Sequence, residues 1–188
     1  KMNKFKVPDY WFWKNFFNKK EILDLNKLIN KHKLTEKIVG QDPKAGNSVK
    51  TSKVYWVSYK NIKDKIEKLI DNILDVNQHN FGYNLFEIRN PLLNYNIYNK
   101  GGEYSFHCDS STSPTHDIKL TLLINISTKQ YTGGEFCLLK TETPSFISDF
   151  TEPGDVILLR SHLLHKVNPV KNGTRESLTM FLTGPKFI

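Results

Sequence analysis

The apolar residues in the first half of the chain recur three and four positions apart, which is the spacing of one helical face. The first such run follows Asn18 and Glu21, two residues with the spacing of an N-terminal capping box. A second run covers residues 62–74. The pattern predicts a helix from about 19 to 32 and a second helix over the later run, with a short strand at 54–57 between them.

Beyond residue 83 the pattern changes to short β-prone runs separated by glycine, proline, asparagine or aspartate. These runs cover residues 84–89, 92–98, 103–107, 118–126, 134–139, 155–160, 163–168 and 176–183. Gly133-Gly134 is expected to form a tight hairpin turn, and Pro153-Gly154 a turn before the strand at 155–160. Two helices followed by about eight short strands predict an antiparallel double sheet.

We therefore expect a β-rich α+β fold, a double-stranded β-helix (jelly roll) with N-terminal helices packed on the outside of one sheet. Residues 1–188 are expected to form a single domain, with a helical part of about 1–82 and a jelly-roll core of about 83–188. An aromatic cluster within residues 5–17 is expected to dock on the core.

Composition points to a folded protein, since 38% of the residues are hydrophobic and 12% are aromatic. The sequence shows no signal-type or membrane-spanning apolar run. Its two cysteines lack any disulfide or zinc pattern. We therefore expect a cytoplasmic protein without a membrane partner. The net charge of +8 raises the question of nucleic-acid binding. The basic residues are scattered, however, and only Arg89, Arg160 and Arg175 are arginines, so nucleic acid is not an expected partner.

His107 and Asp109 form the first candidate for chemistry. In an extended segment the side chains at i and i+2 point to the same face, so the imidazole and the carboxylate can meet one metal ion while Cys108 turns away. A hydrogen-bonded histidine beside a turn aspartate is an equally simple reading of the pair. The sequence supplies further candidate metal ligands at His32, His79, His116, His162 and His165.

A third ligand would complete the 2-His-1-carboxylate set of non-haem Fe(II) oxygenases. His32 and His79 lie in or after the predicted helices and read as surface residues. His162 and His165 are three positions apart, so in a strand they point to opposite faces, and spacing alone does not choose between them.

Several ordered motifs over residues 90–184 resemble the prolyl 4-hydroxylase-like branch of the Fe(II)/2-oxoglutarate-dependent oxygenases, which includes the bacterial PKHD-type hydroxylases. The segment from Tyr98 to Asp109 resembles the stretch that leads into the family's His-x-Asp ligands. The other matching motifs are Lys119-Leu-Thr121, Tyr131-Thr-Gly133-Gly134-Glu135, Pro153-Gly154-Asp155 and His165-Lys-Val-Asn-Pro169-Val170 with Gly173-Thr-Arg175.

The resemblance implies that His107, Asp109 and His165 are both the iron ligands and the catalytic residues, with His162 outside that ligand set. It implies that Arg175 binds the distal carboxylate of 2-oxoglutarate, a contact that a planar guanidinium can make with two hydrogen bonds. Tyr98 and Thr121 match family residues that reach the same carboxylate.

The activity implied by the resemblance is hydroxylation with release of succinate and CO2. The cofactors are Fe(2+) and 2-oxoglutarate, with O2 as cosubstrate and ascorbate (vitamin C) as an optional addition. Related halogenases lack the carboxylate ligand, so Asp109 favours hydroxylation. The implied substrate is a prolyl residue of a protein or peptide, or a free amino acid. The loops at 40–52, 110–117 and 140–151 would select it, and the sequence does not fix the substrate or the oligomeric state.

Two other functions compete with hydroxylation. An AlkB-like nucleic-acid dealkylase would fit the positive charge, but that family carries a second arginine six positions after the cosubstrate arginine, where this chain has Phe181. A jelly-roll module that binds without catalysis is the other alternative. The presence of every expected ligand position counts against it.

Overall fold

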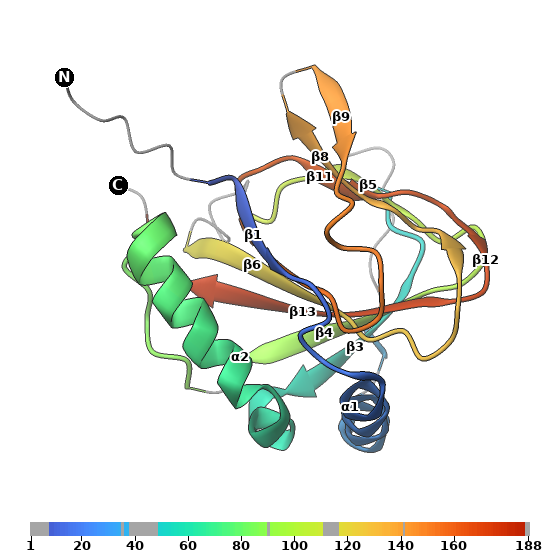
Figure 1. The fold of residues 1–188 in the computed structure, drawn as a ribbon, viewed down its shortest axis with the longest axis horizontal. Coiled ribbons are helices and arrows are strands. Elements are labelled where there is room, and N and C mark those ends of the chain that lie inside the picture. The colour runs from blue at the N-terminus through green and yellow to red at the C-terminus, as the bar shows by residue number, and fades with distance from the viewer. Residues whose placement is uncertain are drawn as a thin grey trace.

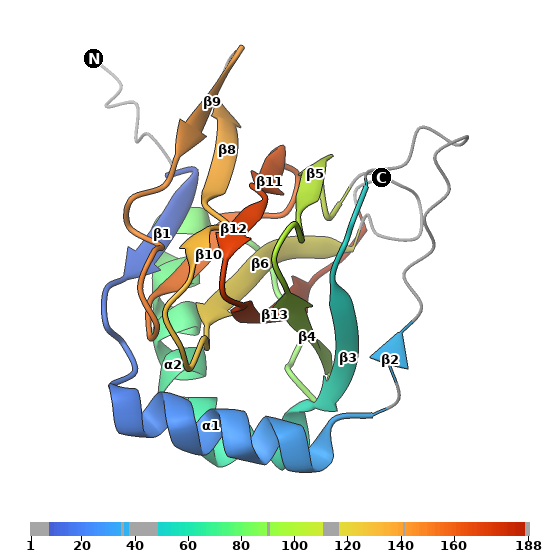
Figure 2. The ribbon, with the colours of Figure 1, turned by 90° about the vertical axis from the view of Figure 1, so that its right-hand side faces the viewer.

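Two antiparallel sheets lie face to face, and two helices cover the outer side of the larger sheet (Figures 1 and 2). The computed structural model describes residues 8–34, 36–37, 49–89, 91–110, 117–140 and 142–186. The larger sheet has the strand order β1 (Tyr10–Trp13), β10 (Val156–Arg160), β6 (Ile118–Asn125), β13 (Arg175–Thr183), β4 (Leu92–Tyr98), β3 (Lys53–Ser58) and β2 (Glu36–Lys37).

The smaller sheet has the order β5 (Tyr104–His107), β11 (His165–Val167), β8 (Phe136–Lys140) and β9 (Thr143–Phe146). A third pairing joins β12 (Val170–Asn172) to β7 (Thr132–Gly133). The β8–β9 hairpin extends away from the rest of the sheet (Figure 2). Because β5 and β11 are neighbours, the residues at their ends can share one site.

Both helices form where the apolar spacing predicts them. Helix α1 (Lys19–His32) begins with the predicted capping box, in which Glu21 N donates to Asn18 Oδ1 at 3.0 Å and Asn18 N donates to Glu21 Oε2 at 2.8 Å. Helix α2 (Lys63–Val76) follows a 3₁₀ turn, η2 (Tyr59–Asn61), and continues into a π-helical turn, η3 (Asn77–Phe81). No helix in the described part of the chain has both the length and the apolar character to cross a membrane.

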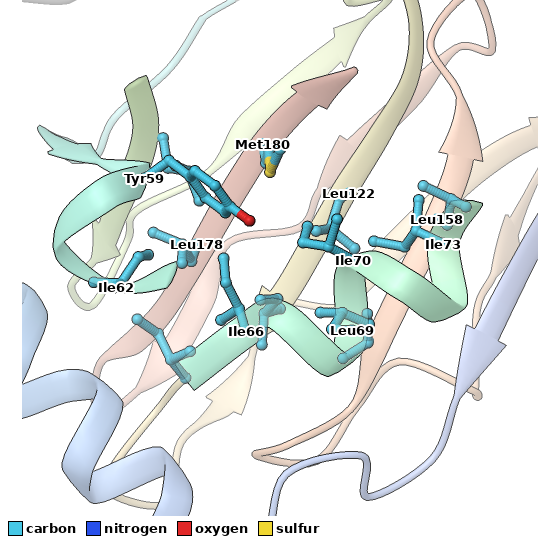
Figure 3. Close-up of a cluster of buried hydrophobic side chains, with 14 of the residues drawn as sticks. Tyr59, Ile62, Ile66, Leu69, Ile70, Ile73, Leu122, Leu158, Leu178 and Met180 are labelled. Atoms are coloured by element: carbon cyan, nitrogen blue, oxygen red, sulfur yellow. The ribbon is translucent and has the colours of Figure 1, made fainter. Parts of the chain in front are cut away.

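The large sheet separates two hydrophobic cores. The outer core lies between the sheet and the helices, where Ile66, Ile70 and Ile73 of α2 point toward the strands (Figure 3). The inner core lies between the two sheets and includes Leu123, Phe136, Val167 and others. Since strand residues alternate between the two faces, the inner strands β3, β4, β6, β10 and β13 supply apolar side chains to the outer core from one face and leave the other for the interior.

The strand predictions were correct for the middle of the sheets and wrong at several edges. The run at 92–98 is β4, but residues 84–89 form no strand, and only Phe86 N pairs with Thr183 O in that stretch. The aromatic run at Tyr10–Trp13 is an edge strand, β1, which pairs with β10. Gly133-Gly134 is not a hairpin turn, because Gly133 pairs with Val170 of β12.

A buried carboxylate ties the N-terminal segment to the turn before β10. The side chain of Asp155 is fully buried and accepts hydrogen bonds from the backbone amides of Asn15, Thr151 and Glu152 at 2.7–3.0 Å and from Lys14 Nζ at 2.6 Å. The neighbouring Gly154 has φ +93°, and a Cβ there would stand 2.0 Å from Phe17 O. The predicted turn is therefore a junction between two distant segments.

We predict that Asp155→Ala lowers the free energy of unfolding by about 3 kcal/mol, because three backbone amides and one ammonium group lose a fully buried acceptor. Urea denaturation followed by circular dichroism measures the change. Glu152→Ala, which truncates an exposed carboxylate in the same turn, is the matched control and should change stability by less than about 0.5 kcal/mol. Equal effects of the two substitutions would contradict the assigned role of Asp155.

Candidate metal centre

The antiparallel pairing of β5 with β11 brings the predicted ligands together. His107 lies opposite His165 in the register of the two strands. Asp109 follows β5 and faces both rings, with Oδ1 3.7 Å from His107 Nε2 and Oδ2 3.5 Å from His165 Nε2. One ligand atom from each of the three residues lies within 4.8 Å of the others. One metal ion can therefore contact all three side chains.

Backbone carbonyls fix which nitrogen of each imidazole faces the cluster. His107 Nδ1 lies 2.8 Å from Ser105 O, and His165 Nδ1 lies 2.9 Å from Leu163 O. A carbonyl only accepts, so each Nδ1 carries a proton and each Nε2 is the nitrogen that faces Asp109. Burial, and then the proximity of His165, lowers the pKa of His107 to about 3. The donor set is the 2-His-1-carboxylate set that Fe(II) uses in oxygenases.

Aromatic side chains hold the two imidazole rings. Tyr104 stacks on His107 with ring centroids 3.5 Å apart, and Phe136 lies 5.5 Å from the ring of His165. Alternation along a regular strand would not put residues three apart on one face. An irregular register, in which Val167 pairs with Tyr104 two positions after His165 pairs with His107, makes this stack possible.

Arg175 is a buried cation at the start of β13, opposite Tyr98 of β4. Its side chain is 1% exposed, with its guanidinium carbon 5.5 Å from the ring centre of Tyr98 and 5.7 Å from that of Phe150. Nη1 donates to Ser177 Oγ at 3.2 Å, while Nε has no partner. No carboxylate among the described residues pairs with it. Because a buried charge without a counter-ion is costly, the position suits an anionic ligand such as a carboxylate.

Tyr98 lies beside this arginine and is also buried. Burial raises the pKa of Tyr98 to about 12, although Arg175 acts in the opposite direction. The hydroxyl therefore keeps its proton at neutral pH and can donate a hydrogen bond to an acceptor beside Arg175. The structure thus brings Tyr98 and Arg175 together, as the sequence motifs predict.

Thr121 lies at the metal cluster and not beside Arg175. Its Oγ1 donates to Asp109 Oδ2 at 2.7 Å. In the sheet Thr121 pairs with Phe181, which lies six residues after Arg175 on β13. The backbone of Thr121 is therefore about 20 Å from that of Arg175 along the strand direction. In the structure the partner of the Thr121 hydroxyl is therefore the carboxylate of Asp109, and its expected contact with 2-oxoglutarate stays a prediction.

A cavity of about 190 Å³ adjoins the cluster and is lined by all three ligand side chains, Tyr98 and Thr121. Its opposite wall is polar. Lys50 Nζ donates to Asn96 Oδ1 at 2.8 Å, and Asn96 Nδ2 donates to Thr179 Oγ1 at 3.1 Å. The sequence pattern does not single out these wall residues, because a polar side chain inside a strand can equally find its hydrogen-bond partners within the core.

The other candidate residues lie apart from the cluster. His162 is exposed, His79 contacts Asp75 on the surface of α2, and His32 ends α1. Cys108 turns its Sγ to His162 O at 3.1 Å, away from the ligands. His116 lies outside the described residues, as do most of loops 40–52 and 110–117.

Comparison with known proteins agrees with the geometry. Residues 93–183 match the family model of the 2OG-Fe(II) oxygenase superfamily. Over 89 residues the chain is 32% identical to the PKHD-type hydroxylase PiuC of Pseudomonas aeruginosa, an alignment that covers 43% of this chain and 38% of that relative. A PKHD-type hydroxylase from another strain of that species matches with the same values. The match thus spans well under half the length of these relatives.

Solved prolyl hydroxylases share the fold over nearly the whole chain. A prolyl-4-hydroxylase from Pseudomonas putida superposes with a TM-score of 0.70 at 13% identity, covering 94% of this chain and 93% of that one. The viral collagen prolyl hydroxylase of Paramecium Bursaria Chlorella virus-1, in a 2OG complex, gives 0.67 at 19% identity, with coverages of 97% and 100%. These likenesses confirm the jelly-roll fold.

Just under half of the chain, residues 93–183, therefore matches the 2OG-Fe(II) oxygenase superfamily. Within it, the relatives named above are PKHD-type hydroxylases in sequence and prolyl hydroxylases in fold. Fe(II) and 2-oxoglutarate are the cofactors of this superfamily. The cluster of His107, Asp109 and His165 fits the iron, and the buried Arg175 without a counter-ion fits a carboxylate of 2-oxoglutarate.

Acid should destabilise the metal-free protein through His107. The pKa of this imidazole falls from 6.5 in the unfolded chain to about 3 in the folded one, so the unfolded state binds more protons as the pH drops. Between pH 7 and pH 5 this group alone should lower the free energy of unfolding by about 2 kcal/mol. Urea denaturation at both pH values measures the loss. The His107→Gln variant lacks this imidazole, so its free energy of unfolding should fall by about 2 kcal/mol less than that of the wild type over the same pH range. An identical fall in both proteins would contradict the shifted pKa.

Proposed function

We propose that this chain is an Fe(II)- and 2-oxoglutarate-dependent dioxygenase that hydroxylates its substrate with release of succinate and CO2. The observation that carries the proposal is the convergence of two imidazoles and one carboxylate on a cavity, with the buried Arg175 beside Tyr98 of its lining. We further propose that the helices and the jelly roll, residues 1–188, act as one oxygenase domain.

In this proposal His107, Asp109 and His165 would hold the iron. When bound, iron and 2-oxoglutarate supply the redox chemistry that side chains lack. The protein's part is to present two Nε2 atoms and one carboxylate in a fixed arrangement. Because Ser105 O and Leu163 O keep the protons on Nδ1, the ligand atoms need no rearrangement before metal binds.

Arg175 and Tyr98 would bind the distal carboxylate of 2-oxoglutarate. The guanidinium offers Nε, which has no protein partner, and the tyrosine hydroxyl offers a proton that it retains at neutral pH. Leu123, Phe136 and Val167 form the apolar lining between this end and the metal ligands. Such a lining excludes water and strengthens the electrostatic contacts made inside it.

For the primary substrate we propose a prolyl residue of a peptide or protein, or a free amino acid. The sequence relatives are named hydroxylases. The structural neighbours include a prolyl hydroxylase from Trichoplax adhaerens in complex with a hypoxia inducible factor peptide fragment. That chain superposes with a TM-score of 0.68 at 17% identity, covering 96% of this chain and 86% of that one. The polar wall formed by Lys50, Asn96 and Thr179 supports a substrate with polar groups beside the oxidised carbon.

The purified protein with Fe(II), 2-oxoglutarate and O2 should form succinate in the presence of a cognate substrate, screened from proline-rich peptides and free amino acids. His107→Ala should lower this rate to background, because it removes one of the three metal ligands. His79→Ala, which truncates an exposed histidine on the helical side, should keep the wild-type rate. Succinate release that survives His107→Ala would contradict the site assignment.

Arg175→Gln should raise the dissociation constant of 2-oxoglutarate at least about tenfold, because a charge-assisted contact with the carboxylate is lost. Calorimetric titration of 2-oxoglutarate into Mn(II)-loaded protein measures this constant. Arg89→Gln, at an arginine whose side chain is exposed, is the control and should leave it unchanged. An unchanged constant in Arg175→Gln would move the carboxylate site elsewhere.

A further inference from the structure

Two buried hydroxyl groups contact the carboxylate of the metal cluster. Thr121 is 1% exposed and Ser161 is fully buried. Thr121 Oγ1 lies 2.7 Å from Asp109 Oδ2 and 3.0 Å from Ser161 Oγ. The three polar groups form one continuous hydrogen-bonded chain that ends on a ligand of the proposed iron site.

The direction of the hydrogen bonds follows from the donors available. An ionised carboxylate only accepts, so the single proton of the Thr121 hydroxyl points at Asp109. The oxygen of Thr121 is then the acceptor for the proton of Ser161. Each hydroxyl polarises the next, so the hydrogen bond on Asp109 is stronger than an isolated one.

The hydrogen bonds that run from Ser161 through Thr121 also distinguish the two oxygens of Asp109. Oδ2 accepts from Thr121, whereas Oδ1 accepts no hydrogen bond from the described residues. Oδ1 thus keeps its lone pairs for a metal ion. The hydroxyl contact restrains rotation of the carboxylate, which would otherwise be free to turn within the cluster.

Ser161 holds the main chain of the same ligand. Its carbonyl accepts from Asp109 N at 2.9 Å and from Ser110 N at 3.1 Å, and its own amide donates to Lys119 O at 3.1 Å. Ser161 follows β10 and precedes β11, which carries His165. One residue therefore connects the segment of the aspartate ligand, the strand of Thr121 and the approach to the second histidine.

We propose that Thr121, supported by Ser161, is a positioning residue for the metal-ligating carboxylate and not a contact of 2-oxoglutarate. The inference rests on the proposed function, since it assumes that Asp109 binds the iron. It assigns the Thr121 hydroxyl to metal affinity, while binding of the cosubstrate is assigned to Arg175 and Tyr98.

Mn(II) titration of the metal-free protein, with free Mn(II) read by electron paramagnetic resonance, tests the proposal without turnover. Thr121→Val removes the hydroxyl at nearly constant shape and should weaken Mn(II) binding about 10- to 100-fold. Thr121→Ser restores the donor and should bind within about threefold of wild type. Ser161→Ala should also weaken binding, by less than Thr121→Val, and it decides the question if the valine variant does not fold.

Thr128→Val is the matched control, because it removes a threonine hydroxyl from another carboxylate, Glu176, far from the cluster, and should not change Mn(II) binding. With saturating Mn(II), Thr121→Val should bind 2-oxoglutarate as wild type does. Unchanged Mn(II) affinity in folded Thr121→Val, or weaker 2-oxoglutarate binding with unchanged Mn(II) affinity, would overturn the proposal. Failure of the folded wild-type protein to bind Mn(II) would instead refute the proposed function on which it rests.

Discussion

The candidate site depends on the pairing of β5 with β11. This pairing sets His107 opposite His165 across two hydrogen-bonded strands. Asp109 reaches the same point because its backbone amide is bonded to Ser161 O at the start of the connection to β11. A slip of one residue in either strand would turn a histidine to the other face of the sheet, so the register of two short strands determines whether a metal site exists.

The interior of the jelly roll has opposite electrostatic character at its two ends. At one end the protein offers a carboxylate and two imidazoles, a donor set that suits a divalent cation. At the other end it buries the guanidinium of Arg175 without a described counter-ion. A dianion that chelates the metal and extends to the arginine would satisfy both ends, and 2-oxoglutarate has that chemistry.

The sequence predicts the elements that are regular and misses those defined by tertiary contacts. Helix 19–32 and strand 92–98 match the structure because repeated apolar spacing and a capping box specify them. The edge strand at Tyr10–Trp13 has too few residues for a strand pattern to emerge. The contact of Thr121 with Asp109 was not predicted, because a motif gives the place of a residue in the chain but not the partner of its hydroxyl. The stack of Tyr104 on His107 depends on an irregular register that no pattern reveals.

The proposed site for one divalent iron is formed by His107, Asp109 and His165. No other histidine of the described residues takes part in it. Anaerobic titration of Fe(II) into the metal-free protein tests it most directly, with His165→Ala compared against His162→Ala. The two histidines are three residues apart, but only His165 is buried against the cluster. Wild type and His162→Ala should each bind one Fe(II) per chain, whereas His165→Ala should lose most of its affinity. Loss in His162→Ala, or full binding in His165→Ala, would contradict the account.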